Sequence, residues 1–202
     1  MSAPKILWWD TPLMSCMNEL EKIQLLALAR ASIQYGLGHN EVMPLDLEHY
    51  PQVYAAPGAS FVTLQKNGEL RGCIGTLQAY QALALDIVQH AHGAAFCDPR
   101  FPKVVSEELD GLHIEISILG PSSAIIFESE ADLLQQLVPL KDGLTIEGLG
   151  HKATFLPQVW HNLREPAAFL THLKSKAGLG GEPITPAISA YRYCVSSFEE
   201  RD

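Results

Sequence analysis

The sequence predicts an α+β fold with a mainly antiparallel sheet and flanking helices. Asn67-Gly68 separates two apolar-rich runs, and residues 112–119, LHIEISIL, alternate between apolar and polar side chains. The first pattern is typical of a β-hairpin and the second of a strand with one buried face. Helical patterns interrupt these strands irregularly, which is the arrangement expected of an α+β protein.

The hairpin is predicted for residues 61–75, FVTLQKNGELRGCIG. A type I′ turn needs positive φ at both central positions, which Asn67 and Gly68 tolerate better than other residues. This loop places Lys66 opposite Glu69, and an ion pair between them would favour the register by roughly 0.2–1 kcal/mol.

The same register predicts which side chains of the hairpin share a face. It places Leu64 opposite Arg71 and Val62 opposite Cys73. Because side chains alternate along a strand, these four residues project from one face. The other face is expected to carry Phe61, Thr63, Leu70 and Ile74.

Arg71, Cys73 and two glycines form the first candidate site. Gly72 and Gly75 predict a bulge or a place where backbone or a ligand comes close. A thiol reacts as its thiolate, which a neighbouring cation such as Arg71 favours. The alternative is an edge strand that turns a corner and carries a buried structural cysteine.

Length and charge limit the class of protein. The 202 residues, 47% of them hydrophobic and 18% charged, can form one domain or a main domain with a smaller lobe. The net charge of −9 disfavours a nucleic-acid partner, because such affinity depends on clustered Lys and Arg.

The cysteines and the N-terminus predict the compartment. Four cysteines, at positions 16, 73, 97 and 194, contain no C-x-x-C pair or zinc-like spacing. We therefore expect free thiols, no metal site and no cofactor. Asp10 and Pro12 interrupt the first residues, and no apolar run approaches roughly 20 residues, so we expect no signal peptide and a soluble cytoplasmic protein.

Two more segments carry candidate chemistry. In Asp98-Pro99-Arg100-Phe101-Pro102, two prolines fix a turn. Its charges either bind a ligand carboxylate or phosphate through Arg100, or pair with each other as a loop staple. In the strand 112–119, His113 and Glu115 share the polar face and could act in proton transfer if that face lines a cleft, although a solvated face is the default.

Helix signals place the other elements. Asn18 and Glu21 form a capping box for a helix over residues 18–35, which Gly36 would end. A second helix is predicted over residues 78–96, with His90 and His92 as surface or capping residues.

The C-terminal half is predicted to alternate in the same way. The expected elements are a strand at 124–127, a helix from Ser129 to about Leu137, a hairpin-like pair at 144–147 and 151–156, a helix opened by Pro166 and followed by Gly178, and a last strand at 188–195.

Several motifs in one order carry a resemblance to a known family. They are LRGCIG (70–75), AAF-x-DPRFP (94–102), IEISIL (114–119), DGLTIE (142–147), TFLPQVW (154–160) and FL-x-HLKSKAGL (169–179). Together they resemble the AMME chromosomal region (AMMECR) domain family, whose bacterial and archaeal members are similar to protein A of the AmmeMemoRadiSam system. The matching positions are Arg71, Gly72, Cys73, Gly75, Asp98, Pro99, Arg100, Phe101, Glu115, Pro157 and Gln158.

The resemblance implies a single AMMECR-like domain over residues 15–199, after an irregular segment at 1–14. It implies a larger and a smaller lobe, with a cleft near residues 70–75 and 98–102. It also implies an association with a radical S-adenosylmethionine enzyme and a Memo-like protein, but it does not supply a reaction.

Three functions follow from these residues. The first is a small-molecule-handling enzyme, or a component of one, in which Cys73 is the nucleophile or an acyl-type carrier and His113, Glu115 or another group removes the proton. The second is a non-catalytic adaptor that binds a small anionic ligand or a protein through Arg71, Asp98 and Arg100. The third and weakest is a nucleic-acid-binding regulator.

Overall fold

A computed structural model describes residues 17–48, 50–181, 183–185 and 187–201. These residues form two compact units, each with its own hydrophobic core. The larger unit contains the described residues up to Leu119 and those from Ser196 onward, and the smaller unit contains Gly120–Val195. The predicted segment 1–14 lies outside the described residues. Within the described part, no helix is both long and apolar enough to cross a lipid bilayer.

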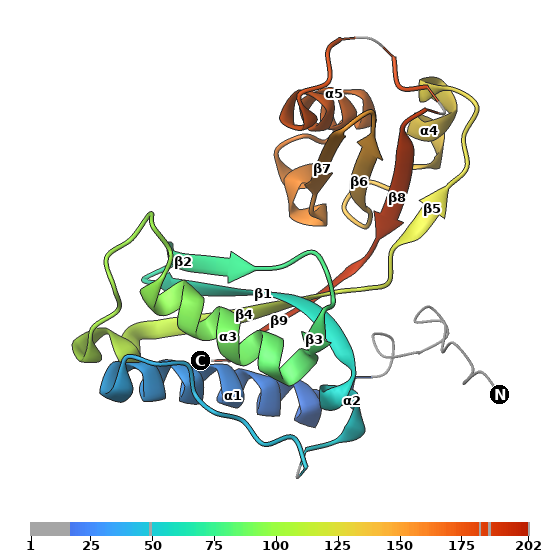
Figure 1. The fold of residues 1–202 in the computed structure, drawn as a ribbon. Coiled ribbons are helices and arrows are strands. Elements are labelled where there is room, and N and C mark those ends of the chain that lie inside the picture. The colour runs from blue at the N-terminus through green and yellow to red at the C-terminus, as the bar shows by residue number, and fades with distance from the viewer. Residues whose placement is uncertain (1–16, 49, 182, 186, 202) are drawn as a thin grey trace, which may run out of the picture. The chain divides into compact units, whose positions relative to one another are not determined.

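The larger unit is a sheet with helices against one face (Figure 1). Its strands follow the order β2-β1-β4-β9, and β3 pairs with the start of β1. The elements are α1 (Glu19–His39), α2 (Gln52–Ala55), β1 (Pro57–Lys66), β2 (Glu69–Gly75), β3 (Gln81–Ala82), α3 (Leu83–Phe96), a 3-10 helix (Ser106–Gly111), β4 (Leu112–Leu119) and β9 (Val195–Glu199).

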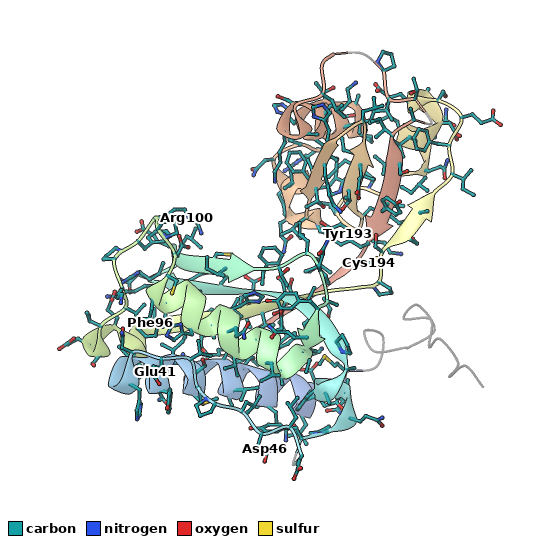
Figure 2. The ribbon with its side chains drawn as sticks, in the orientation of Figure 1. Glu41, Asp46, Phe96, Arg100, Tyr193 and Cys194 are labelled. Atoms are coloured by element: carbon teal, nitrogen blue, oxygen red, sulfur yellow. The ribbon has the colours of Figure 1, made fainter. Side chains whose placement is uncertain are left out.

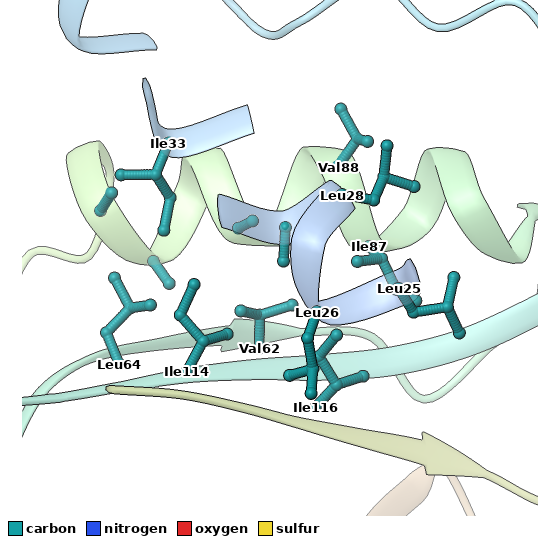
Figure 3. Close-up of a cluster of buried hydrophobic side chains, with 14 of the residues drawn as sticks. Leu25, Leu26, Leu28, Ile33, Val62, Leu64, Ile87, Val88, Ile114 and Ile116 are labelled. Atoms are coloured by element: carbon teal, nitrogen blue, oxygen red, sulfur yellow. The ribbon is translucent and has the colours of Figure 1, made fainter. Parts of the chain in front are cut away.

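The core of this unit lies between the sheet and the helices α1 and α3 (Figure 3). Leu112, Ile114, Ile116 and Ile118 of β4 are all buried, which confirms the predicted alternation. Val62 and Leu64 of β1 pack into the same cluster. His113 and Glu115 therefore lie on the opposite face of the sheet.

The two helices predicted for this unit, α1 and α3, begin or end differently from the prediction. Asn18 caps α1 with the predicted capping box to Glu21, but the helix continues past Gly36 to a left-handed C-cap at Asn40. Gly36 instead allows Phe96 of α3 to pack closely, because a Cβ there would overlap the Phe96 ring. The start of α3 is at Leu83, since residues 81–82 pair with β1.

The hairpin turn is as predicted, whereas the register beyond it is not. Asn67 and Gly68 have φ of 54° and 78°, and Lys66 lies opposite Glu69. The register then shifts by one residue, because Arg71 is an extra residue in β2. The further paired positions are Leu64 with Gly72, Thr63 with Cys73, and Val62 with Ile74.

This bulge corrects the predicted faces. Cys73 lies on the face of Thr63, and Ile74 lies on the buried face of Val62, because one extra residue exchanges the two sides of a strand. The cross-strand ion pair of Lys66 is also different from the prediction, since Lys66 Nζ lies 3.0 Å from Glu108 Oε1.

The smaller unit is a second antiparallel sheet, in the order β5-β8-β6-β7, with its own helices. Trp160 and Phe169 stack at 3.8 Å between ring centroids in its core. The elements are β5 (Ser123–Ile125), α4 (Glu130–Gln136), β6 (Gly143–Gly148), β7 (His151–Phe155), a 3-10 helix (Pro157–His161), α5 (Pro166–Ala177) and β8 (Ser189–Tyr193).

The predicted caps of this unit are confirmed, and its strand ends are adjusted. Ser129 caps α4, and α5 runs from Pro166 to the left-handed Gly178. The predicted strand at 124–127 is Ser123–Ile125. The predicted last strand is divided, because the chain leaves the smaller sheet after Tyr193 and joins the larger sheet as β9.

Candidate functional site

Cys73 lies on β2, the outer strand of the larger sheet, and two side chains hold its backbone from outside. The Cys73 amide donates to Asp98 Oδ2 at 2.9 Å, and Arg100 Nη2 donates to the Cys73 carbonyl at 3.2 Å. A carboxylate and a guanidinium thus satisfy the groups that an adjacent strand would otherwise bind. Cys73 is therefore fixed in position by the turn at residues 98–102.

The Asp98–Arg100 pair follows the loop-staple alternative for this turn. Asp98 accepts from Arg100 Nε at 2.9 Å, Nη2 at 2.6 Å and the Arg100 amide at 3.1 Å. The carboxylate is 2% exposed and the guanidinium side chain 53% exposed. Hydrogen bonds from Arg100 chiefly, and from the Cys73 amide, hold the pKa of Asp98 well below its usual range. The cationic member of the pair therefore faces outward (Figure 2).

Arg100 is also the cation that contacts Cys73, through the hydrogen bond from Nη2 to the Cys73 carbonyl. Its hydrogen bond to Asp98 raises the pKa of Arg100, and the nearby Cys73 side chain contributes in the same direction. The Cζ atom of Arg100 lies 5.4 Å from the centre of the Phe101 ring, which supports the guanidinium plane. Sequence reasoning assigned this role to Arg71.

On the face away from the helices, the Cys73 sulfur contacts Thr63, which leads to further polar side chains on the neighbouring strands. Thr63 Oγ1 donates to Cys73 Sγ at 3.3 Å. Thr63 pairs with Cys73 on one side and with Glu115 on the other. Ser117 Oγ lies 3.4 Å from Glu115 Oε1 and 2.8 Å from Ser197 Oγ. The structure therefore places Cys73 and Glu115 on one face, with Thr63 between them.

Arg71 contacts Glu108 instead of Cys73. Its Nε and Nη2 atoms lie 3.1 and 2.9 Å from the two oxygens of Glu108, and it donates to the carbonyls of Pro102 and Lys103. Hydrogen bonds from Arg71, and then from Lys66, lower the pKa of Glu108 to about 2. Arg71 thus ties the segment after α3 to β2, because the bulge turns it away from Cys73.

Packing accounts for the two glycines of the motif. A Cβ at Gly72 would overlap the carbonyl oxygen of Ala94 in α3, and a Cβ at Gly75 would overlap the Phe61 ring. Both positions therefore allow close contact within the larger unit.

The predicted surface or capping position of His90 is wrong. His90 is buried, and its Nδ1 lies 3.1 Å from Asp86 Oδ2. The same oxygen accepts from the amide and hydroxyl of Ser60 at 2.8 and 2.7 Å. The carboxylate fills the gap on β1 between β2 and β3, where the Ser60 amide lacks a strand partner. His92 is half-buried, and burial together with Lys103 lowers its pKa.

Sequence reasoning missed Thr63 and Glu108. The signal that could have found Thr63 was the presence of Gly72 and Gly75, which indicate a bulge in β2. The observed bulge pairs Thr63 with Cys73. Glu108 had no local signal, since it lies 37 residues beyond Arg71. Among the described residues, no three His, Cys, Asp or Glu side chains are grouped to hold a metal ion.

Comparison with known proteins shows the family of the chain. The AMMECR1 family model matches residues 26–198. The chain belongs to the AMMECR1 family. Two archaeal relatives match most of the length of this AMMECR1-family chain. A protein from Methanothermobacter thermautotrophicus is 35% identical over 184 residues, which are 87% of this chain and 92% of the relative. Protein MJ0810 from Methanocaldococcus jannaschii is 34% identical over 180 residues, or 85% and 86% of the two chains.

A solved structure has a fold similar to that of this chain. The crystal structure of protein PH0010 from Pyrococcus horikoshii matches it with a TM-score of 0.76 and 28% identity, covering 88% of this chain and 90% of that chain. The α+β class with antiparallel sheets and flanking helices is thereby confirmed.

Proposed function

We propose that this AMMECR1-family protein is a small-molecule-handling enzyme, or a component of one, in which Cys73 is the nucleophile. The observation that carries the proposal is the fixed position of Cys73. Asp98 and Arg100 hold its backbone from the strand edge, while Thr63 contacts its sulfur on the sheet face. A nucleophile reacts efficiently when its position is set before the substrate arrives.

The chemistry requires a thiolate. Arg100 Nη2 donates to the Cys73 carbonyl at 3.2 Å, and the Thr63 hydroxyl donates to the sulfur at 3.3 Å, a hydrogen bond that is stronger to a charged acceptor. In the proposed step, a sulfur electron pair forms a bond to an electrophilic carbon of the substrate. The leaving group departs with the electron pair of the broken bond, and the thiol proton passes to water.

Glu115 is proposed as the acid or base that exchanges a proton with the substrate. It lies on the Cys73 face, opposite Thr63 on the next strand, and Ser117 contacts its carboxylate. Its separation from Cys73 by a whole strand suits a group that acts on the substrate rather than on the thiol.

The proposed partners are a radical S-adenosylmethionine enzyme and a Memo-like protein, with the cytoplasm as the proposed compartment. The partners rest on the resemblance to the AmmeMemoRadiSam system. The compartment rests on the free thiols of Cys73, Cys97 and Cys194, since free cysteines are typical of reducing compartments.

Alkylation by iodoacetamide tests the nucleophile. We expect Cys73 to react faster than Cys97 and Cys194, although both of these are exposed and Cys73 is half-buried. Peptide mass spectrometry would follow each cysteine separately, and Thr63→Val should slow only Cys73. A Cys73 that reacts more slowly than both exposed cysteines would contradict the proposal.

The adaptor is the second candidate, and the half-exposed Arg100 is the observation that favours it. Arg71 and Asp98 are engaged within the protein, so a binding role would depend on Arg100. Partner capture that survives Cys73→Ser and fails in Arg100→Ala would support the adaptor over the enzyme.

A further inference from the structure

The hydrogen bonds of Arg100 leave one part of its guanidinium available. Nε and Nη2 donate to Asp98, and Nη2 also donates to the Cys73 carbonyl. Among the described residues, Nη1 has no hydrogen-bond partner. Because 53% of the side chain is exposed, these N–H groups can reach a ligand.

The guanidinium is held rigidly in this orientation. Two hydrogen bonds to Asp98 fix its plane, and the Phe101 ring lies beside it. Asp98 is 2% exposed, so its negative charge lies on the protein side of the pair. A ligand therefore approaches the positively charged guanidinium first. Its binding costs little side-chain entropy, because Arg100 is already held in one orientation.

We infer that Arg100 forms an anion subsite beside Cys73, so that the substrate is an electrophile carrying a small anionic group. This inference rests on the proposed function of Cys73. The guanidinium would bind a carboxylate or phosphate oxygen through Nη1, while the electrophilic carbon lies at the sulfur. A preference for anions at Cys73 would have to come from Arg100 itself, because the net charge of −9 means that the protein as a whole repels anions.

Two alkylating reagents of nearly equal shape test the subsite. Iodoacetate is anionic and iodoacetamide is neutral, and each transfers its carbon to the thiolate with loss of iodide. For each cysteine, the ratio of the iodoacetate rate to the iodoacetamide rate cancels differences in accessibility and in thiolate content. We expect this ratio at Cys73 to exceed that at Cys97 and Cys194 by about fivefold at low salt. The excess should fall at 1 M salt.

Substitutions connect the preference to Arg100. Arg100→Gln should lower the ratio at Cys73 to that of the exposed cysteines, and Arg100→Lys should keep part of it. Asp98→Asn should raise the ratio, because it removes the neutralising carboxylate. Acetate and inorganic phosphate, added separately as competitors, show which anion protects Cys73 better and so distinguish the two anionic groups.

The outcomes separate the inference from the proposed function. Fast iodoacetamide alkylation of Cys73 with no excess of the ratio would overturn the anion subsite and leave the nucleophile intact. A Cys73 that is slow with both reagents would overturn both. An excess that persists in Arg100→Gln would also contradict the inference, because the positive charge would then lie elsewhere.

Discussion

At the scale of single residues, two carboxylates determine how the segment after α3 meets β2. Asp98 binds the amide of Cys73 and the guanidinium of Arg100, while Glu108 binds Arg71 and Lys66. Arg71 and Arg100 both contact the junction between this segment and β2, yet Arg71 stabilises the segment while Arg100 faces outward. The two arginines therefore differ in their hydrogen-bond partners: Arg71 is a structural residue, and Arg100 is the candidate binding residue.

The Glu108 contact predicts a stability change in acid. Its pKa falls from 4.5 to about 2 on folding, so the unfolded chain takes up this proton at a higher pH than the folded chain does. The contribution of Glu108 to the free energy of unfolding is therefore complete above about pH 4.5 and is lost as the pH falls toward 2.

Urea titrations across this range would measure the effect. Glu108→Gln should lower the free energy of unfolding by about 2 kcal/mol at pH 7, because Arg71 loses its charged partner. The variant should also lose less stability than the wild type between pH 4.5 and pH 2. Parallel acid dependence in the two proteins would show that Glu108 is not the titrating group.

At the scale of elements, the bulge in β2 is the feature on which the site depends. It places Cys73 beside Thr63, directs Arg71 to Glu108, and turns Gly72 toward α3. Only glycine allows the Ala94 carbonyl to approach β2 so closely.

Gly72→Ala should therefore separate β2 from α3. We expect the free energy of unfolding to fall by about 3 kcal/mol, since the added Cβ meets backbone that cannot rotate away. Gly38→Ala is the matched control, because Gly38 lies in α1 with nothing within 4 Å of its added Cβ. The control should gain about 0.5–1 kcal/mol from helix propensity. Equal stability of the two variants would refute the role given to Gly72.

At the scale of the whole molecule, the larger unit is built from two separate parts of the chain. Residues before Gly120 form most of it, and β9 completes the sheet after the chain has formed the smaller unit. Arg30 of α1 binds the C-terminal segment through two hydrogen bonds of 2.6 Å to the Glu200 carboxylate. The Glu200 amide also donates to the Ile114 carbonyl. The C-terminal residues are thus part of the larger fold.

Removal of residues 196–202 should affect the two units unequally. The outer side of β4 loses its neighbouring strand, so amide hydrogen exchange over residues 112–119 should accelerate at least tenfold. Residues 143–155 should exchange as before, because the core of the smaller unit contains no residue from this segment. Unchanged protection in residues 112–119 would contradict the structural role of β9.

The sequence by itself determined the local features of this protein. The Asn67-Gly68 turn, the alternation of residues 112–119, the Asn18 cap and the Pro166 helix start each depend on neighbouring residues. Conformational preference acts over such short distances, and these features appear in the structure as predicted.

The tertiary structure alone decided how the candidate site is assembled. One extra residue in β2 exchanged the strand faces, and the residues that hold Arg71 and the Cys73 backbone, Glu108, Asp98 and Arg100, come from segments distant in sequence. His90 is buried because Asp86 fills a gap between strands that no local pattern indicates. Contacts of this kind depend on where separate elements meet, and their energies favour one arrangement only after the core has packed.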